Sequence, residues 1–517
     1  MASFTATPNK LFIENYKILQ KGKEHNTNLS HNYHSVDLVT GKLEEPSQPN
    51  LLIGFSLDHS GSMAGSFTST KNHTPLQHCL HTVNNIVDYL GDMHDDNPNL
   101  NISVTLNAFD NQIKNCGHYN VGDDIEEAKF LAKINKLKPR GGTNISGAFE
   151  SLKNLPIYSQ TSDSQKAHIL LTDGQPNEGK TSAEGITEQN PGGKQFYIGY
   201  GIDHDANLLQ KMAELTNGSY SFVESFENAG MVYGEIIHSL LYDAVKNITV
   251  TVKGAEVYDF TKNEWTSKIK FNNFASEHTQ SLILRSSWNS VELVTVNIIY
   301  TETGNGVIHS KTDSFNCYNC TNGESKQSNR DVDVEKQMFR QRALEGLFHA
   351  KNADYESKNS LKTQLIELEK EMKEFMDAKN LTDDAFMQKL LGDVYVAYTG
   401  MDCYGAGNAF IAARLVTQGN QMAYDVNNFD VLDRQNAVDL GDELFGGPIQ
   451  RNSAPSFPRQ SSAPVSAGEI CTTIRMPKPG MLRQSSCYTT PTQATVMRAC
   501  SQPISPPISD TEEITEE

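Results

Sequence analysis

From residue 49 to about residue 243, continuous apolar runs alternate with segments whose apolar residues recur every three to four positions. The continuous runs predict buried strands at 50–58, 101–109, 167–173, 194–202 and 220–225. The periodic segments predict helices at 75–90, 125–137, 205–215 and 232–245. This alternation predicts an α/β fold in which a doubly wound, mostly parallel sheet is covered by helices on both faces.

The pattern changes after residue 247. Four short segments with a period near two, separated by Gly, Asn and Ser, predict a small antiparallel β-sandwich over 244–316. Longer periodic segments then predict a helical bundle over 330–425, with helices at 332–356, 358–379, 382–398 and 406–424. The second of these helices carries an apolar seam with alternating spacings of four and three, which is more typical of a bundle core than of a partner-binding zipper: Leu361, Leu365, Leu368, Met372 and Phe375.

The two ends of the chain carry weaker signals. Residues 1–47 form an N-terminal extension ahead of an α/β domain that we place at 48–243. The segment 446–517 holds more than half of the 19 prolines, many serines and almost no aliphatic clusters, which predicts a disordered tail. Arginines shortly before serines, as in "RQSSCYTTP", are typical of phosphorylation sites, so we expect either a regulated tether or an inert solubilising extension.

Composition narrows the range of functions. The chain has 517 residues and a formal net charge of −19, which disfavours nucleic acids and anionic membranes as partners. Neither a signal peptide nor a stretch of about 20 apolar residues is recognisable, so we expect a cytoplasmic or otherwise intracellular protein without membrane insertion. The eight scattered cysteines agree with a reducing compartment.

Oxygen-bearing side chains gather where predicted strands end. The first strand runs into "SLDHSGSM", which supplies Asp58, Ser60 and Ser62. Two glycines precede Thr143 in "RGGTNISGAF", and Asp173 ends another strand in "LLTDGQP". Because the carboxyl ends of parallel strands meet at one edge of a sheet, these side chains are expected to converge. Hard oxygen ligands of this kind suit Mg²⁺, so the sequence predicts a metal site there.

These motifs resemble those of the von Willebrand factor type A domain family and its metal-ion-dependent adhesion site. The order D-x-S-x-S, then Thr, then Asp in a T-D-G-like turn is matched by Asp58, Ser60, Ser62, Thr143 and Asp173. The resemblance implies a Rossmann-like fold over roughly 48–243 and a bound Mg²⁺, with Mn²⁺ or Ca²⁺ as alternatives. It further implies a non-enzymatic scaffold that binds an acidic side chain of a partner protein through the ion, with oligomerisation possible.

Two other functions remain open. Gly174–Thr181 matches the phosphate-loop pattern G-x-x-x-x-G-K-[ST], which would make the protein a nucleotide-binding hydrolase. Pro176 and Glu178 disfavour this interpretation, because one removes a backbone N–H from the loop and the other adds negative charge. The second alternative is a structural component of a large, possibly viral, assembly. We find no catalytic constellation and expect no enzymatic activity.

Cys317 and Cys320 have the spacing of half a zinc site. No second pair lies nearby in the sequence, which favours two free thiols in a linker over a metal site.

Overall fold

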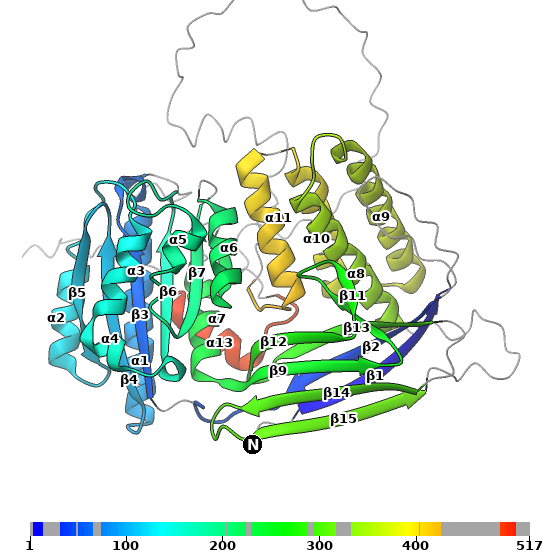
Figure 1. Cartoon of the computed structure of the whole chain (residues 1–517), viewed down its shortest axis with the longest axis horizontal. Coiled ribbons are helices and arrows are strands. Elements are labelled where there is room, and N and C mark those ends of the chain that lie inside the picture. Colours follow the sequence, from blue (N-terminus) through cyan, green and yellow to red (C-terminus); the bar gives the residue numbers. More distant parts are fainter. Residues whose placement is uncertain are drawn as a thin grey trace, which may run out of the picture.

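The computed structural model describes residues 4–13, 31–47, 50–65, 74–201, 204–223, 229–287, 293–316, 332–402, 404–424 and 486–502. Figure 1 shows an α/β unit at the left, stacked antiparallel sheets at the lower right, and a group of helices above those sheets. The fold class predicted from the sequence is confirmed for all three parts.

The α/β unit is built on a six-stranded sheet in the order β5-β4-β3-β6-β7-β8. Neighbouring strands are parallel except for β5, which is antiparallel to β4 at one edge. The strands are β3 (Asn50–Asp58), β4 (Asn101–Phe109), β5 (Ile113–Asn120), β6 (Lys166–Thr172), β7 (Lys194–Tyr200) and β8 (Ser219–Val223). The sequence did not predict β5, because it is a half-exposed edge strand without a continuous apolar run.

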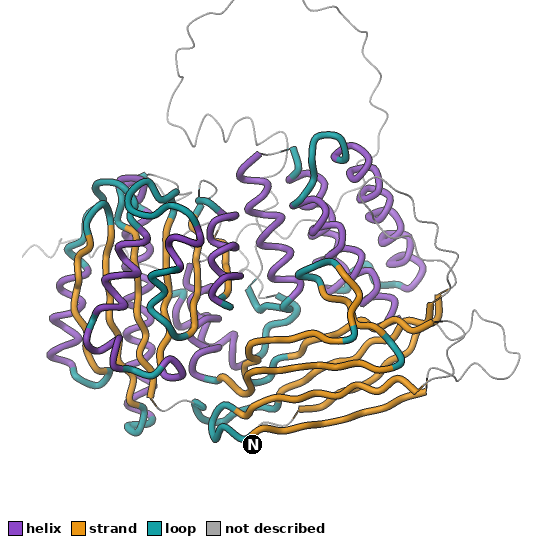
Figure 2. Tube along the Cα trace, viewed as in Figure 1, coloured by secondary structure: helices purple, strands orange, loops and turns teal. Residues whose placement is uncertain are grey.

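Helices cover both faces of this sheet, and Figure 2 shows the strands running side by side between them. The helices are α1 (Pro75–Asp96), α2 (Asp124–Ile134), α3 (Ile145–Asn154), α4 (Pro156–Gln160), α5 (Ala183–Thr187), α6 (Ala206–Thr216) and α7 (Ala229–Leu241). The longest helix, α1, begins with Pro75 and a reciprocal capping box between Thr74 and Gln77, which satisfies backbone N–H groups that a helix start leaves unpaired.

Two antiparallel sheets form the sandwich, in the orders β1-β2-β13-β10-β11 and β12-β9-β14-β15. Their strands are β1 (Phe4–Ile13), β2 (His31–Thr40), β9 (Asp243–Lys253), β10 (Glu256–Asp259), β11 (Glu264–Thr266), β12 (Lys268–Ala275), β13 (Thr279–Ser287), β14 (Leu293–Glu302) and β15 (Ile308–Asn316). Valines and leucines of both sheets share a core, including Val36, Val250 and Leu284.

The sandwich corrects one expectation from the sequence. Residues 31–40, which we assigned to an N-terminal extension, instead form β2, and residues 31–39 pair with β13. Val36 and Leu38 of β2 are buried in the sandwich core. The sequence could not show this, because the partner strand lies far along the chain and β2 itself carries a mixed polar pattern.

The helical part comprises α8 (Val332–Lys351), α9 (Lys358–Lys379), α10 (Ala385–Gly400) and α11 (Tyr404–Gly419). The predicted seam of α9 is confirmed as core at Leu361, Leu365, Leu368 and Met372, while Phe375 is only partly buried. The helices also share a continuous core with the α/β unit, because α11 packs against β8 and Phe410 contacts Phe222 edge-to-face with a centroid distance of 5.0 Å.

A final helix corrects the predicted disordered tail. α13 (Pro491–Cys500), drawn in red in Figure 1, packs against α7 and α1 of the α/β unit. Its Val496, Met497 and Cys500 are buried in the main core. The stretches 425–485 and 503–517, which hold the rest of the predicted tail, lie outside the described residues.

Two further expectations concern the Cys317 and Cys320 pair and the absence of membrane insertion. Cys317 and Cys320 lie outside the described residues. Within the described ranges, every helix is too short or too polar to cross a membrane.

Candidate metal centre at the carboxyl edge of the sheet

The candidate site lies where β3 and β6 end side by side. The two strands pair in parallel up to Leu57 and Leu171, so the residues that follow leave the sheet at the same edge. Asp58 is the last residue of β3, and Asp173 comes directly after β6. The parallel pairing therefore delivers both predicted carboxylates to one place.

A chain of hydrogen bonds joins the residues of the D-x-S-x-S loop to Asp173. The backbone N–H of Ser60 donates to Asp58 Oδ1 at 2.8 Å. The hydroxyls of Ser60 and Ser62 lie 3.0 Å apart, and the Ser62 hydroxyl donates to Asp173 Oδ1 at 2.7 Å. Four of the five predicted ligands therefore belong to one connected cluster.

The fifth predicted ligand, Thr143, borders the same cluster. The backbone N–H of Gly61 donates to the Gly141 carbonyl at 3.1 Å, which ties the serine loop to the threonine loop. A Cβ atom placed on Gly174 would lie 3.4 Å from Thr143 Oγ1 and 3.7 Å from Ser62 Oγ. Both hydroxyls thus face the same small space next to Gly174, and the structure brings all five predicted side chains together.

The electrostatics of the cluster favour a cation. Asp58 is fully buried, and burial together with the negative charge of Asp173 raises the pKa of Asp58 to about 7. Hydrogen bonds from Thr172 Oγ1, at 2.6 Å, and from the Ser60 N–H partly oppose this rise in the pKa. A divalent cation between the two carboxylates would offset their repulsion and favour their ionised forms.

The donor set fits a hard cation such as Mg²⁺, because it consists of two carboxylates and three hydroxyl groups. In the described ranges, no three His, Cys, Asp or Glu side chains gather in a way that could hold a metal. An ion at this edge would therefore depend on the serine and threonine hydroxyls as well as on Asp58 and Asp173.

Sequence reasoning missed Asp110, which follows β4 and is fully buried. Its carboxylate accepts hydrogen bonds from Arg140 Nε at 2.5 Å and from the Gln112 N–H at 2.6 Å. Its carbonyl accepts the N–H of Asn144 at 2.9 Å. Asp110 therefore anchors the loop that carries Thr143 on both sides of the threonine. The available signal was another aspartate directly after a strand.

A second supporting residue is Asn177, in the loop after β6. Its side-chain oxygen accepts the N–H of Thr143 at 2.8 Å, and its own N–H donates to the Thr143 carbonyl at 3.1 Å. This reciprocal pair fixes the threonine backbone against the Asp173 loop. Nothing in the sequence distinguishes Asn177 from other loop asparagines.

The residues that match the phosphate-loop pattern make contacts within the protein. Lys180 forms an ion pair with Glu188, and its backbone N–H donates to Ser146 Oγ at 2.9 Å. The helix that follows, α5, has five residues, and Ser182 already accepts one of its first N–H groups. A phosphate loop relies on a lysine and a helix start that face the phosphates, and here both are engaged elsewhere.

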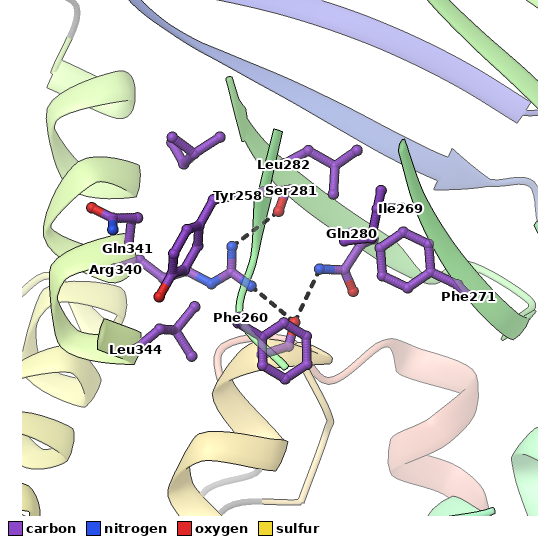
Figure 3. Close-up of a pocket in the computed structure, with 12 residues that line it drawn as sticks. Tyr258, Phe260, Ile269, Phe271, Gln280, Ser281, Leu282, Arg340, Gln341 and Leu344 are labelled. Atoms are coloured by element: carbon purple, nitrogen blue, oxygen red, sulfur yellow. Dashed lines mark hydrogen bonds between the residues drawn. The ribbon is translucent and has the colours of Figure 1, made fainter. Parts of the chain in front are cut away.

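A pocket lies between the sandwich and the helices, and Figure 3 shows its lining. Arg340 lies in it, fully enclosed, and donates to the carbonyls of Ser281, Gln418 and Gly419 at 3.0, 2.9 and 3.1 Å. Gln280 also donates to the Gly419 carbonyl, at 3.1 Å. These polar groups bind backbone carbonyls of α11 and β13, so the pocket is a structural junction.

Solved structures that resemble the chain do so at low sequence identity. No curated protein matches the chain. Among solved structures, the chain resembles the ArnB paralog VWA2 from Sulfolobus acidocaldarius, with 13% identity and a TM-score of 0.41, over 81% of this chain and 99% of that one. It also resembles a von Willebrand factor type A protein from Catenulispora acidiphila, with 12% identity and a TM-score of 0.48, over 82% of this chain and 97% of that one.

The sequence comparison is confined to one region of the chain. Residues 53–235 match the sequence model of the von Willebrand factor type A domain, and this range runs from β3 into α7. Over residues 53–235 the chain therefore has the sequence pattern of a von Willebrand factor type A domain.

Proposed function

We propose that this protein is a non-enzymatic, metal-dependent protein-binding scaffold. Mg²⁺, or Mn²⁺ or Ca²⁺ in its place, would be held by Asp58, Ser60, Ser62, Thr143 and Asp173 and would take a carboxylate of a partner protein as a further ligand. Type A domains are commonly protein-interaction modules, which supports this class of function. The observation that carries the proposal is the convergence of two buried carboxylates and three hydroxyls at one sheet edge.

The side chains at this site have different roles in binding an ion. Asp58 and Asp173 supply the negative charge that attracts a cation, and the three hydroxyls supply neutral oxygen donors. Asp110 and Asn177 hold the Thr143 loop in place, so the donors are positioned before an ion arrives. The bound ion would supply an open coordination position, which is where specificity for a partner's acidic side chain resides.

The remaining parts of the chain serve as a frame. The helices share a core with the type A domain, so the metal site is carried on a rigid body. We place this scaffold inside the cell, since the buried residues Cys79, Cys116 and Cys500 are free thiols.

Metal binding is tested by calorimetric titration of the full chain with Mg²⁺ and Mn²⁺ after EDTA treatment. We expect one site per chain, which Asp58→Asn or Asp173→Asn weakens at least tenfold. Glu178→Gln is the matched control, because it removes an exposed negative charge from the same loop outside the cluster. Equal affinities for the wild type and all three variants would refute the metal site.

Partner binding is tested by affinity capture with the full chain in Mg²⁺ and in EDTA. The proposal expects captured proteins that EDTA and Asp58→Asn both release and Glu178→Gln retains. Substituting single Asp and Glu residues of the captured partner should then identify one carboxylate whose loss abolishes binding. Capture that is indifferent to EDTA and to Asp58→Asn would favour a structural role without metal.

A further inference from the structure

α13 has the side-chain pattern of a helix that binds in a groove. Gln493, Val496, Met497 and Cys500 are buried, at spacings i, i+3, i+4 and i+7. Pro491, Thr495 and Arg498 on the opposite side are exposed. This arrangement of anchors is the one by which amphipathic helices bind into hydrophobic grooves of other proteins.

The floor of the groove is formed by two glycines one turn apart on α7. A Cβ atom on Gly234 would lie 2.5 Å from the Cα of Met497, and one on Gly230 would lie 2.3 Å from the carbonyl oxygen of Cys500. Real Cβ atoms do not approach that closely, so any larger residue would push α13 away. α7 therefore admits the backbone of α13 itself, and not only its side chains.

One end of the groove recognises the end of a helix. Asn85 Nδ2, on α1, donates to the carbonyls of Cys500 and Gln502 at 3.2 and 3.1 Å. His81, one turn away on α1, donates from Nε2 to the same Gln502 carbonyl at 2.7 Å. The last carbonyls of a helix lack hydrogen-bond donors within the helix, and the side chains of Asn85 and His81 provide such donors. The contacts fix the direction in which α13 lies.

The other end is tied to the residues that follow α11. The Ser486 N–H and the Thr489 hydroxyl both donate to the Ala423 carbonyl, at 3.0 and 3.1 Å. The Ala423 and Tyr424 N–H groups in turn donate to the buried carboxylate of Glu235 on α7, at 2.7 and 3.1 Å. The chain therefore leaves the described structure after Tyr424 and re-enters it at Ser486 at the same place.

We propose that the groove between α1 and α7 is a helix-binding site, and that its ligand is the chain's own segment 486–502, bound in cis as a detachable strap. The adjacency of Ala423 and Ser486 favours the same chain as the source, because a connection that begins and ends at one point needs no second copy. The apolar anchors Val496, Met497 and Cys500, with hydrogen bonds from α1 to the last carbonyls, form a helix-in-groove contact of the kind that proteins use for reversible docking.

The test uses the full chain and a fluorescent synthetic peptide of residues 486–502, followed by fluorescence anisotropy. Met497→Asp in the chain places a charge against the glycine floor and should vacate the groove. We expect this variant to bind the wild-type peptide at least tenfold more tightly than the wild-type chain does. Thr495→Asp, at an exposed position of the same helix, is the matched control and should behave like the wild-type chain.

Two additions make the test specific to the groove. A peptide that carries Met497→Asp should not bind, and adding Gly234→Val to the Met497→Asp chain should abolish binding of the wild-type peptide. If Met497→Asp does not fold, Met497→Ala provides a milder release, for which we expect a several-fold gain in peptide affinity. A folded variant without any gain would overturn the proposal. A wild-type dimer that Met497→Asp converts to a monomer would also overturn it, because the strap would then be exchanged between copies.

Discussion

The hydroxyl of Ser62 donates a hydrogen bond to the carboxylate of Asp173 across 2.7 Å, although 111 positions separate the two residues in the chain. They meet because β3 and β6 are adjacent parallel strands that end at the same edge. The candidate metal site therefore forms because the order of the strands in the sheet brings the ends of β3 and β6 together. In addition to the predictions for metal, partner and strap binding, four predictions can be tested by measuring the stability of variants.

The first prediction concerns Asp58. In EDTA at pH 8, Asp58→Asn should raise the stability of the fold by about 2–4 kcal/mol, because it removes a buried charge whose pKa is raised to about 7. The amide can keep both hydrogen bonds, by accepting from the Ser60 N–H and donating to Thr172 Oγ1. Thermal melting in EDTA and in Mg²⁺ measures the effect, and in Mg²⁺ only the wild type should gain stability.

The direction of this effect with pH follows from the raised pKa of Asp58. Between the ordinary value of 3.8 and about 7, the folded metal-free chain holds a proton that the unfolded chain releases. Stability in EDTA should therefore fall as pH rises through this window, and Asp58→Asn should reduce that fall. Glu178→Gln serves as the control, and an equal gain from Mg²⁺ in wild type and Asp58→Asn would contradict the prediction.

The second prediction compares two glycines of the phosphate-loop pattern. Gly179 has a φ of +69°, and a Cβ atom there would lie 2.4 Å from Ser146 Oγ and 2.5 Å from Asn144 Oδ1. Gly179→Ala should cost about 1–3 kcal/mol through backbone strain and through displacement of the Asn144 cap of α3. Gly174→Ala, whose nearest contact would be 3.4 Å, should cost less than about 1 kcal/mol. Equal melting temperatures of the two variants would disprove this account.

The third prediction concerns His168, a buried residue that bridges Ser56 Oγ and Gln195 Oε1 at 2.9 Å each. Burial lowers the pKa of His168 to about 4. Between pH 6.5 and 4 the unfolded chain binds a proton that the folded chain does not, so stability falls as pH falls, by about 1.4 kcal/mol per pH unit for one such group.

The substitution His168→Asn should remove that share of the pH dependence. Urea unfolding between pH 4.5 and 7.5 measures the slope of stability against pH, which should be shallower in the variant. Some slope should remain, because burial also lowers the pKa of His204, His238 and His278 to about 4. A slope identical to that of the wild type would show that His168 does not titrate as the structure requires.

The fourth prediction concerns the junction at Arg340. Arg340→Met would remove the hydrogen bonds of Arg340 to the buried carbonyls of Ser281, Gln418 and Gly419, at a cost of about 3 kcal/mol or more, although the Gly419 carbonyl would keep its bond from Gln280. Lys211→Met is the control, because its ion pair with Glu214 is solvent-exposed and should contribute below about 1 kcal/mol. Denaturant unfolding of both variants provides the measurement, and equal losses would contradict the assigned role.

Much of the fold could be predicted from the sequence because buried central strands are apolar whatever lies beside them. The predicted bounds of β3 and β4 coincide with the observed ones, 50–58 and 101–109. The five candidate ligands could also be named in advance, since each stands near the end of a predicted strand or in a glycine-rich loop. The seam of α9 was visible for the same reason, as its buried face repeats at the helical period.

Tertiary structure alone decided the elements whose own sequences are ambiguous. β2 is a strand of the sandwich because β13 pairs with it, and Asp110 supports the Thr143 loop because Arg140 folds back onto it. In each case the stabilising partner is remote in the chain or lies in another loop, so no local period reveals it.

α13 shows most clearly why local sequence does not determine such an element. A helix of ten residues is marginal in water by itself, so local propensity does not determine whether it forms. Its four anchors stand among prolines and serines that indicate disorder, and its capping box between Thr490 and Gln493 is too common a pattern to outweigh them. The helix is ordered because Gly230 and Gly234 of α7 leave room for its backbone, and that space exists only in the folded protein.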